Sequence, residues 1–247
     1  MTEASPHAPP RAPTRPADIG RWLFWGPFRS LLNPDRPDQV RRLHGLWRAQ
    51  HALASEGKEA MEDELRRCFG GLFTAEGYHA LVQDAYRCAW RVHLEELLLG
   101  RVGPQNVDQW IEFEGIEHLD EALSWGKGVI WLYPHAGAVM MMMAWLSHHG
   151  YDYTQYAARG LAPPEIAAEH PELLASNRWR EKVRAIREAN EDRLPARFLT
   201  HEDSARELYR RLAANKLVGI AYDGRIGHRW APFDYLGRTA LLNTGPY

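Results

Sequence analysis

The stretch GVIWLYPHAGAVMMMM, residues 128–143, sets a short apolar run directly before a proline, a histidine and a turn of small residues. The run GVIWLY has the length and composition of a buried β-strand, and residues 137–149 are typical of a helix. A strand that turns directly into a helix is the repeating unit of a parallel α/β sheet. The stretch therefore predicts the start of the sheet and sets His135 at the carboxyl end of a strand.

The same alternation continues through the second half of the chain. Apolar runs that read as strands lie at residues 152–158, 195–200 and 216–222, and helix-like segments lie between them at about 172–190 and 202–214. Strands that alternate with helices favour a mostly parallel sheet flanked by helices. We therefore predict an α/β fold.

The front of the chain has a different pattern, because residues 37–100 repeat apolar positions at helical spacing. Residues 1–19 are rich in proline and poor in large apolar groups, which predicts a disordered leader. We expect one domain over residues 20–247, mainly helical over 20–110 and α/β over 111–247.

The overall charge excludes a chain-wide attraction to nucleic acid, because 30 basic and 32 acidic residues give a net charge of -2. The two cysteines, Cys68 and Cys88, have no zinc-like spacing and fit a reducing compartment. No apolar run approaches the roughly 20 residues of a membrane span. Residues 20–32, GRWLFWGPFRSLL, concentrate aromatic side chains between two arginines. That mix suits a membrane surface and a core edge equally well.

Polar residues follow three of the predicted strands. His135 follows the first, Arg159 the second and Asp223 the last. In open α/β sheets ligands bind outside the carboxyl ends of the strands, so parallel strands would bring these residues to one edge. His135 suits general-base chemistry, and the small residues that include Gly137 leave room for a substrate. A capping histidine and an ordinary Asp-Gly turn remain the structural alternatives.

Two blocks of sequence, IEFEGIEHLDEALSWGKGVIWLYPHAG and VGIAYDGRIGHRWAPFDYLGRTALLNTGP, resemble the late acyltransferases of lipid A biosynthesis, a branch of the lysophospholipid acyltransferase superfamily. The similarity spans roughly residues 60–247. It implies acyl transfer from an acyl carrier protein or coenzyme A thioester to a hydroxyl of a membrane glycolipid. It also implies no metal and no bound cofactor, a place at the cytoplasmic face of the bacterial inner membrane, and a C-terminal part of the family fold that is missing here.

The resemblance assigns roles to particular residues. His135 matches the family's base and Arg159 its arginine, but Met140 stands where the family has an orienting carboxylate five positions after the histidine. A thioether accepts only weak hydrogen bonds and carries no charge, so Met140 cannot orient the imidazole. The nearest substitutes are Asp223, which the sheet argument brings to the same edge, and Asp152, which begins a strand at its opposite end. We favour Asp223.

Two further features have both a structural and a functional interpretation. Residues 140–143 are four methionines, which suit an acyl-chain groove but fit a helix core better. Arg180, Arg184 and Arg187 share one helical face, which suits lipid phosphates, although interleaved glutamates favour a solvated face. For the whole chain we expect a membrane-associated acyltransferase. The alternative is a catalytically degenerate relative that binds lipid or a partner.

Overall fold

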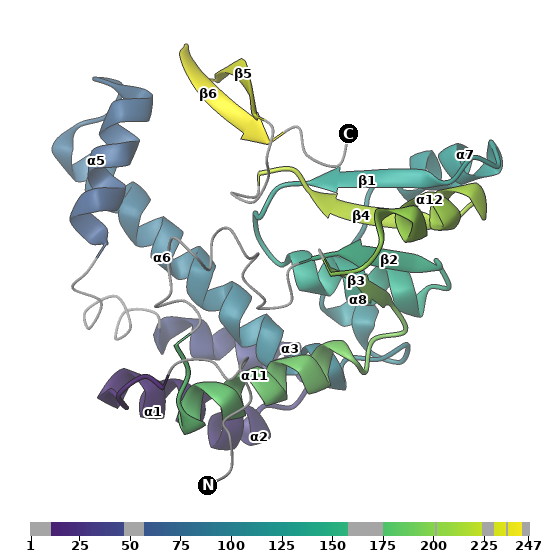
Figure 1. Cartoon of the computed structure of the whole chain (residues 1–247). Coiled ribbons are helices and arrows are strands. Elements are labelled where there is room, and N and C mark those ends of the chain that lie inside the picture. The colour runs from purple at the N-terminus through teal and green to yellow at the C-terminus, as the bar shows by residue number, and fades with distance from the viewer. Residues whose placement is uncertain are drawn as a thin grey trace, which may run out of the picture.

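The computed structural model describes residues 11–46, 57–157, 175–200, 202–223, 230–235 and 237–243. Its centre is a parallel sheet of four strands in the order β1-β4-β2-β3, so the predicted α/β class is confirmed. The strands are β1 (Val129–Tyr133), β2 (Tyr153–Tyr156), β3 (Arg197–Leu199) and β4 (Leu217–Ala221). Each lies inside the run that predicted it. Figure 1 shows β1 and β4 pointing the same way, toward the side on which α6 lies.

Helices cover both faces of the sheet. On one face, α7 (Ile116–Ser124) and α8 (Val139–His148) pack against β1, β2 and β4 through a cluster that contains Leu119, Leu146 and Leu217. On the other face lies α12 (Ala205–Ala213), where the guanidinium of Arg211 donates to the hydroxyl of Thr154. The two-sided cover explains why β2 and β4 are buried at nearly every position, and why β4 reads as a continuous apolar run, since strands buried on both faces do not alternate.

The front of the chain is helical, as predicted. Its elements are α1 (Pro16–Leu23), η1 (Phe24–Phe28), α2 (Arg29–Leu31), α3 (Pro37–Arg42), η2 (Leu43–Leu46), α5 (Lys58–Phe69), α6 (Ala75–Leu98), η3 (Leu99–Arg101) and η4 (Val107–Gln109). The long helix α6 begins at an N-cap, Thr74, whose hydroxyl accepts from the backbone of Gly77. Helix α11 (Arg178–Glu191) joins this helical part from the second half of the chain and packs on α1.

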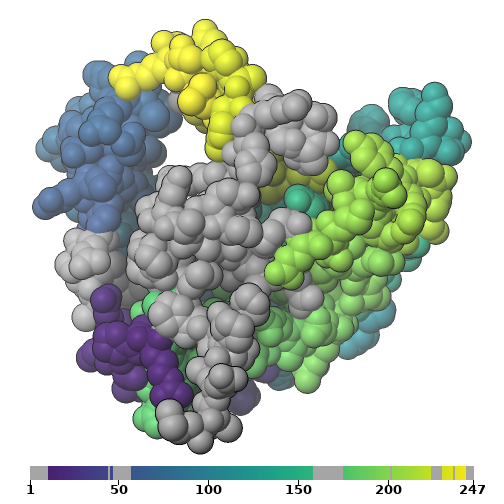
Figure 2. All heavy atoms as spheres, in the orientation of Figure 1, coloured from purple at the N-terminus to yellow at the C-terminus, as the bar shows by residue number. Residues whose placement is uncertain are grey.

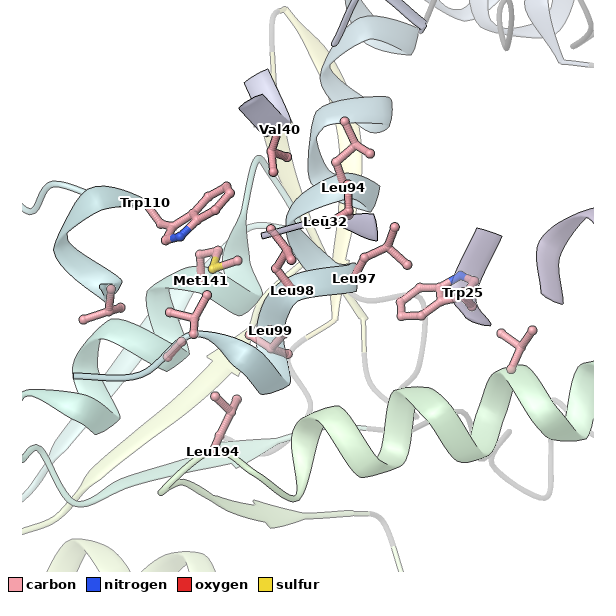
Figure 3. Packing of buried hydrophobic residues seen from close by; sticks show 14 residues of the cluster. Trp25, Leu32, Val40, Leu94, Leu97, Leu98, Leu99, Trp110, Met141 and Leu194 are labelled. Atoms are coloured by element: carbon pink, nitrogen blue, oxygen red, sulfur yellow. The ribbon is translucent and has the colours of Figure 1, made fainter. Parts of the chain in front are cut away.

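The largest apolar cluster lies where α6 and η3 meet α8, α11 and the N-terminal helices. Figure 3 shows Leu97, Leu98 and Leu99 at its centre, with Trp110 and Met141 beside them. This cluster connects the helical front to the sheet, because Met141 belongs to α8, the helix that packs on the strands.

The aromatic side chains of residues 20–32 face this cluster. Trp25 is buried, and Trp22, Phe24 and Phe28 are half-buried against the cluster. Of the two interpretations of the segment, the structure supports the core edge for its aromatic residues. Element η1 is a π-helix with Pro27 inside it, which fits a residue that lacks a backbone donor.

Asp18 ties α1 to α11. Its carboxylate accepts from the backbone N–H of Arg15 and from Arg180, which lies 2.9 Å away, and these contacts lower the pKa of Asp18 to about 2. The unfolded chain would bind this proton near pH 3.8. The structure therefore loses this stabilisation as the pH falls from about 4 to about 2.

We expect Asp18→Asn to have a lower thermal midpoint than the wild type at about pH 5, and a smaller further loss on acidification to about pH 3. Thermal unfolding followed by circular dichroism at both pH values measures this. Asp63→Asn, an exposed position on α5, is the matched control and should behave as the wild type. Equal acid sensitivity of Asp18→Asn and the wild type would contradict the assignment.

A second sheet was not predicted. Strands β5 (Trp230–Tyr235) and β6 (Arg238–Asn243) form an antiparallel hairpin that turns at Gly237, whose φ is 72°. The hairpin projects from the body of the molecule at the top of the view (Figure 2). Pro232 lies inside β5, and a proline within an apolar run argues against a central strand but is accepted in a two-stranded edge.

Candidate active site

His135 and Asp223 emerge together because they occupy equivalent places after two paired strands. Tyr133, the last residue of β1, pairs with Ala221, the last residue of β4, and each of the two candidate residues lies two positions after its strand. The backbone N–H of Tyr222 also donates to the carbonyl of Tyr133 at 3.1 Å, so the parallel pairing continues past both strand ends. For His135 and Asp223, the predicted meeting at one edge of the sheet is confirmed.

The carboxylate of Asp223 holds the histidine at two points. Its Oδ1 atom lies 2.7 Å from Nδ1 of the His135 ring, and its Oδ2 accepts from the backbone N–H of His135 at 2.8 Å. With Nδ1 donating to the carboxylate, the Nε2 atom keeps its lone pair. The His135 side chain is 65% exposed and that of Asp223 is 37% exposed. A substrate can therefore reach this histidine, whose tautomer is fixed for accepting a proton at Nε2.

The residues that follow His135 make an open turn into α8. Gly137 has a φ of 67°, which a residue with a side chain adopts only at a cost, and no atom lies within 4 Å of the place where a Cβ would be. Ala138, the N-cap of α8, provides no side-chain cap. Helix α8 begins at Val139, just after the turn that follows His135, so the positive end of its dipole lies on the side of the histidine, where a developing negative charge would be stabilised.

Met140 does not take part in this arrangement. Its side chain is half-buried and packs against both apolar clusters. Asp152, the other candidate carboxylate, lies before β2 and forms ion pairs with Arg211 and with Lys216, the latter at 3.0 Å. It is therefore at the amino end of the sheet, away from His135. Of the two candidate substitutes for the missing acid, the structure brings only Asp223 to the histidine.

The four methionines fit the core interpretation. Met141 is buried in the cluster around α6 and η3, and Met143 is buried in the cluster under the sheet. Met142 packs partly against the second cluster. Successive helical residues point in different directions, so one run of methionines supplies both sides of α8.

The arginine candidates are not placed at the candidate site by the described residues. Arg159 lies outside the described residues. Arg180 is paired with Asp18, and the guanidinium of Arg187 lies over the ring of Trp25 at 5.4 Å. These two arginines thus have structural partners on α1 and η1. For Arg184, an exposed residue, a phosphate role stays a prediction.

A buried polar cluster beneath the His135–Asp223 pair was missed. Tyr133, Tyr153 and Gln155 lie on one face of β1 and β2, and the Tyr153 hydroxyl donates to the Gln155 side chain. Burial raises the pKa of Tyr133 to about 12 and also raises that of Tyr153, so both phenols stay protonated. The signal in the sequence was Gly219 in the middle of a strand, which marks a close approach.

Neither a metal site nor a membrane span is found in the described part of the chain. No group of three or more potential metal ligands occurs among those residues. No helix among them is both long enough and apolar enough to cross a bilayer.

Comparison with models of known protein families gives a match over most of the chain. The family model described as bacterial lipid A biosynthesis acyltransferase matches residues 22–246, which is most of the chain. A search of curated proteins found no match.

Proposed function

Because the chain belongs to the bacterial lipid A biosynthesis acyltransferase family, we propose that it moves a fatty acyl group from an acyl carrier protein or coenzyme A thioester to a hydroxyl of a membrane glycolipid. The observation that carries this proposal is the contact between His135 Nδ1 and the Asp223 carboxylate at 2.7 Å. It supplies the base and orienter that the chemistry needs, although Met140 occupies the usual place of the acid.

In the proposed reaction, His135 Nε2 takes the proton of the acceptor hydroxyl while the hydroxyl oxygen attacks the thioester carbonyl carbon. The resulting imidazolium is stabilised by Asp223, and the first turn of α8 favours the negative charge that develops on the carbonyl oxygen. When the C–S bond breaks, the imidazolium returns the proton to the leaving thiolate. The acyl group ends on the acceptor oxygen, and His135 is neutral again.

Gly137 and Arg159 have supporting roles in this proposal. Gly137 leaves the approach to His135 open, and Arg159 positions an anionic group of a substrate. The place of action is the cytoplasmic face of the bacterial inner membrane, since the acceptor is a membrane lipid.

The test is transfer of a labelled acyl chain to lipid A precursors in detergent micelles, with acyl carrier protein and coenzyme A thioesters as separate donors. We expect the wild-type chain to transfer the label with one of the donors, and His135→Ala to define the background. If the wild type does not exceed this background with either donor, the enzyme proposal fails.

Met140 favours a second candidate, a degenerate relative that binds lipid or a partner without catalysis. The variant Met140→Glu separates the two, because a decayed site should gain activity when its missing carboxylate returns. We expect no gain, since Asp223 already holds Nδ1, and a loss of stability of about 1–3 kcal/mol because a carboxylate would enter an apolar contact.

The measurements are acyl transfer and urea unfolding, and Met140→Leu is the control of similar volume. The control should keep the acyl-transfer activity of the wild type. Its free energy of unfolding should stay within about 1.5 kcal/mol of the wild-type value. A large gain in transfer by Met140→Glu would favour the degenerate relative.

A further inference from the structure

A cluster of three arginines lies at the C-terminal end of α6, away from the His135–Asp223 pair. Arg29 donates through Nε to the carbonyl of Leu97 at 2.8 Å, and Arg101 donates to the carbonyl of Arg29 at 2.9 Å. Arg193, just after α11, donates to the carbonyl of Gly100 at 3.4 Å. Three cationic side chains from α2, η3 and the end of α11 thus meet around one helix end.

These arginines have no carboxylate partner within the described part of the chain. Burial lowers the pKa of Arg29, and the two neighbouring charges that act on it, those of Arg101 and Arg193, are both positive and lower it further. The last carbonyls of a helix carry only about half a negative charge in total. Capping of α6 therefore explains part of the cluster but leaves an excess of positive charge.

Asn190 gives an independent sign that an acceptor is missing. Its side chain is buried, with only 2% of the residue exposed, and its Oδ1 atom accepts from Arg29 at 2.6 Å. This bond fixes the orientation of the amide, and the Nδ2 group is then buried without an acceptor among the described residues. An unsatisfied buried donor costs about as much as a lost hydrogen bond, so a native structure rarely keeps one without a reason.

The cluster is separate from the candidate active site. Helix α8 begins close to His135 and ends at His148, which lies near the backbone of Val102, the residue after Arg101. A helix of this length spans roughly 15 Å. A ligand at the arginines would thus lie at the opposite end of α8 from the reacting groups.

We propose that Arg29, Arg101, Arg193 and the amide of Asn190 form a binding site for a phosphate group. Guanidinium groups match the oxygens of a phosphate in geometry and charge. The anion would neutralise the excess charge and supply an acceptor to the amide. Access is from the side of Arg193, which is exposed, and Arg101, which is half-buried. This site is independent of the proposed acyl transfer.

The surroundings give a reason to test a phosphate carried by a lipid. Ile19, Leu23, Pro27 and Leu31 recur every fourth residue along α1, η1 and α2, and all four are exposed, Leu31 to 79%. Four residues are close to one helical turn, so this spacing places the four residues, which we call the aliphatic stripe, along one side of the helical run. Leu31 ends the short helix that Arg29 begins, so an apolar surface lies next to the arginines.

Binding to the full chain tests the proposal with two probes. Inorganic phosphate is titrated by calorimetry, and sedimentation with phosphatidylglycerol vesicles is compared with phosphatidylcholine vesicles. We expect Arg101→Gln and Arg193→Gln each to weaken binding about ten- to a hundredfold. The control Arg206→Gln, which removes an exposed arginine of α12, should bind as the wild type.

Asn190→Asp adds a readout that does not depend on a ligand. The new carboxylate would pair with Arg29, so this variant should lose phosphate binding and have a higher thermal midpoint than the wild type without phosphate. A midpoint equal to or lower than that of the wild type, with binding unchanged, would overturn the proposal.

The two probes also distinguish the source of the phosphate. Binding to phosphatidylglycerol vesicles that depends on Arg101 and Arg193 supports a lipid headgroup, and binding of inorganic phosphate without vesicle binding supports a soluble ligand. The proposal is overturned if the wild type binds neither probe, or if Arg206→Gln weakens binding as much as the cluster variants do.

Discussion

Replacing Asp223 with asparagine is expected to lower the turnover number for acyl transfer about 10³- to 10⁴-fold, the scale seen when the orienting aspartate of a serine protease is replaced in the same way. Asparagine keeps the shape of the side chain but not its charge. Its amide can present a donor to Nδ1 of His135, which favours the tautomer with the proton on Nε2. The imidazole would then be unable to accept the proton of the acceptor hydroxyl.

The turnover number at saturating thioester and lipid measures this effect, and circular dichroism shows whether the variant is folded. Because the Asp223 side chain is partly exposed, we expect the thermal midpoint of Asp223→Asn to stay close to that of the wild type. Asp63→Asn, on the exposed side of α5, makes the same chemical change away from the site and should keep full activity. Turnover within about threefold of the wild type would exclude Asp223 as the orienter.

The largest expected effect on stability is that of Gly219→Ala in the central strand β4. A Cβ at this position would overlap the Tyr153 hydroxyl and lie 2.6 Å from the Cζ atom of that ring and 2.9 Å from Oε1 of Gln155. Both neighbours are buried, so neither can move into solvent. We expect the free energy of unfolding to fall by about 3 kcal/mol or more, as in overpacked cores.

Urea unfolding of Gly219→Ala measures this loss, and Gly71→Ala is the control, because a Cβ there meets no atom within 4 Å. Adding Tyr153→Phe to Gly219→Ala removes the overlapping hydroxyl and should recover part of the stability. If Gly219→Ala is as stable as Gly71→Ala, the result would contradict the close packing of Tyr153 and Gln155 against β4.

The sheet and the histidine–aspartate pair could be predicted because both follow from local patterns combined with one topological rule. GVIWLY and KLVGIAY are apolar runs of strand length, and each ends at a polar residue. Once the strands are parallel, residues just after their ends meet at one edge. Only the positions of the strand ends are needed for this inference, and not the directions of side chains. The sequence alone was therefore enough to place Asp223 next to His135.

Features that depend on packing between distant segments could not be predicted. The run of residues 20–32 is equally compatible with a membrane surface and a core, and only its contacts with α6 and α11 put Trp25 inside. The arginine cluster joins Arg29, Arg101 and Arg193, which no periodicity connects. The β5–β6 hairpin was missed because Pro232 weakens the strand signal.

The central claim is that His135 and Asp223 act as one catalytic unit despite Met140, and a double-mutant cycle tests it most directly. The measurement is kcat/KM for acyl transfer by the wild type, His135→Ala, Asp223→Asn and the double variant. Groups that act together give strongly non-additive losses. We predict that the double variant retains the same residual rate as His135→Ala alone. Losses that multiply in the double variant would show that the two residues act independently and would contradict the account.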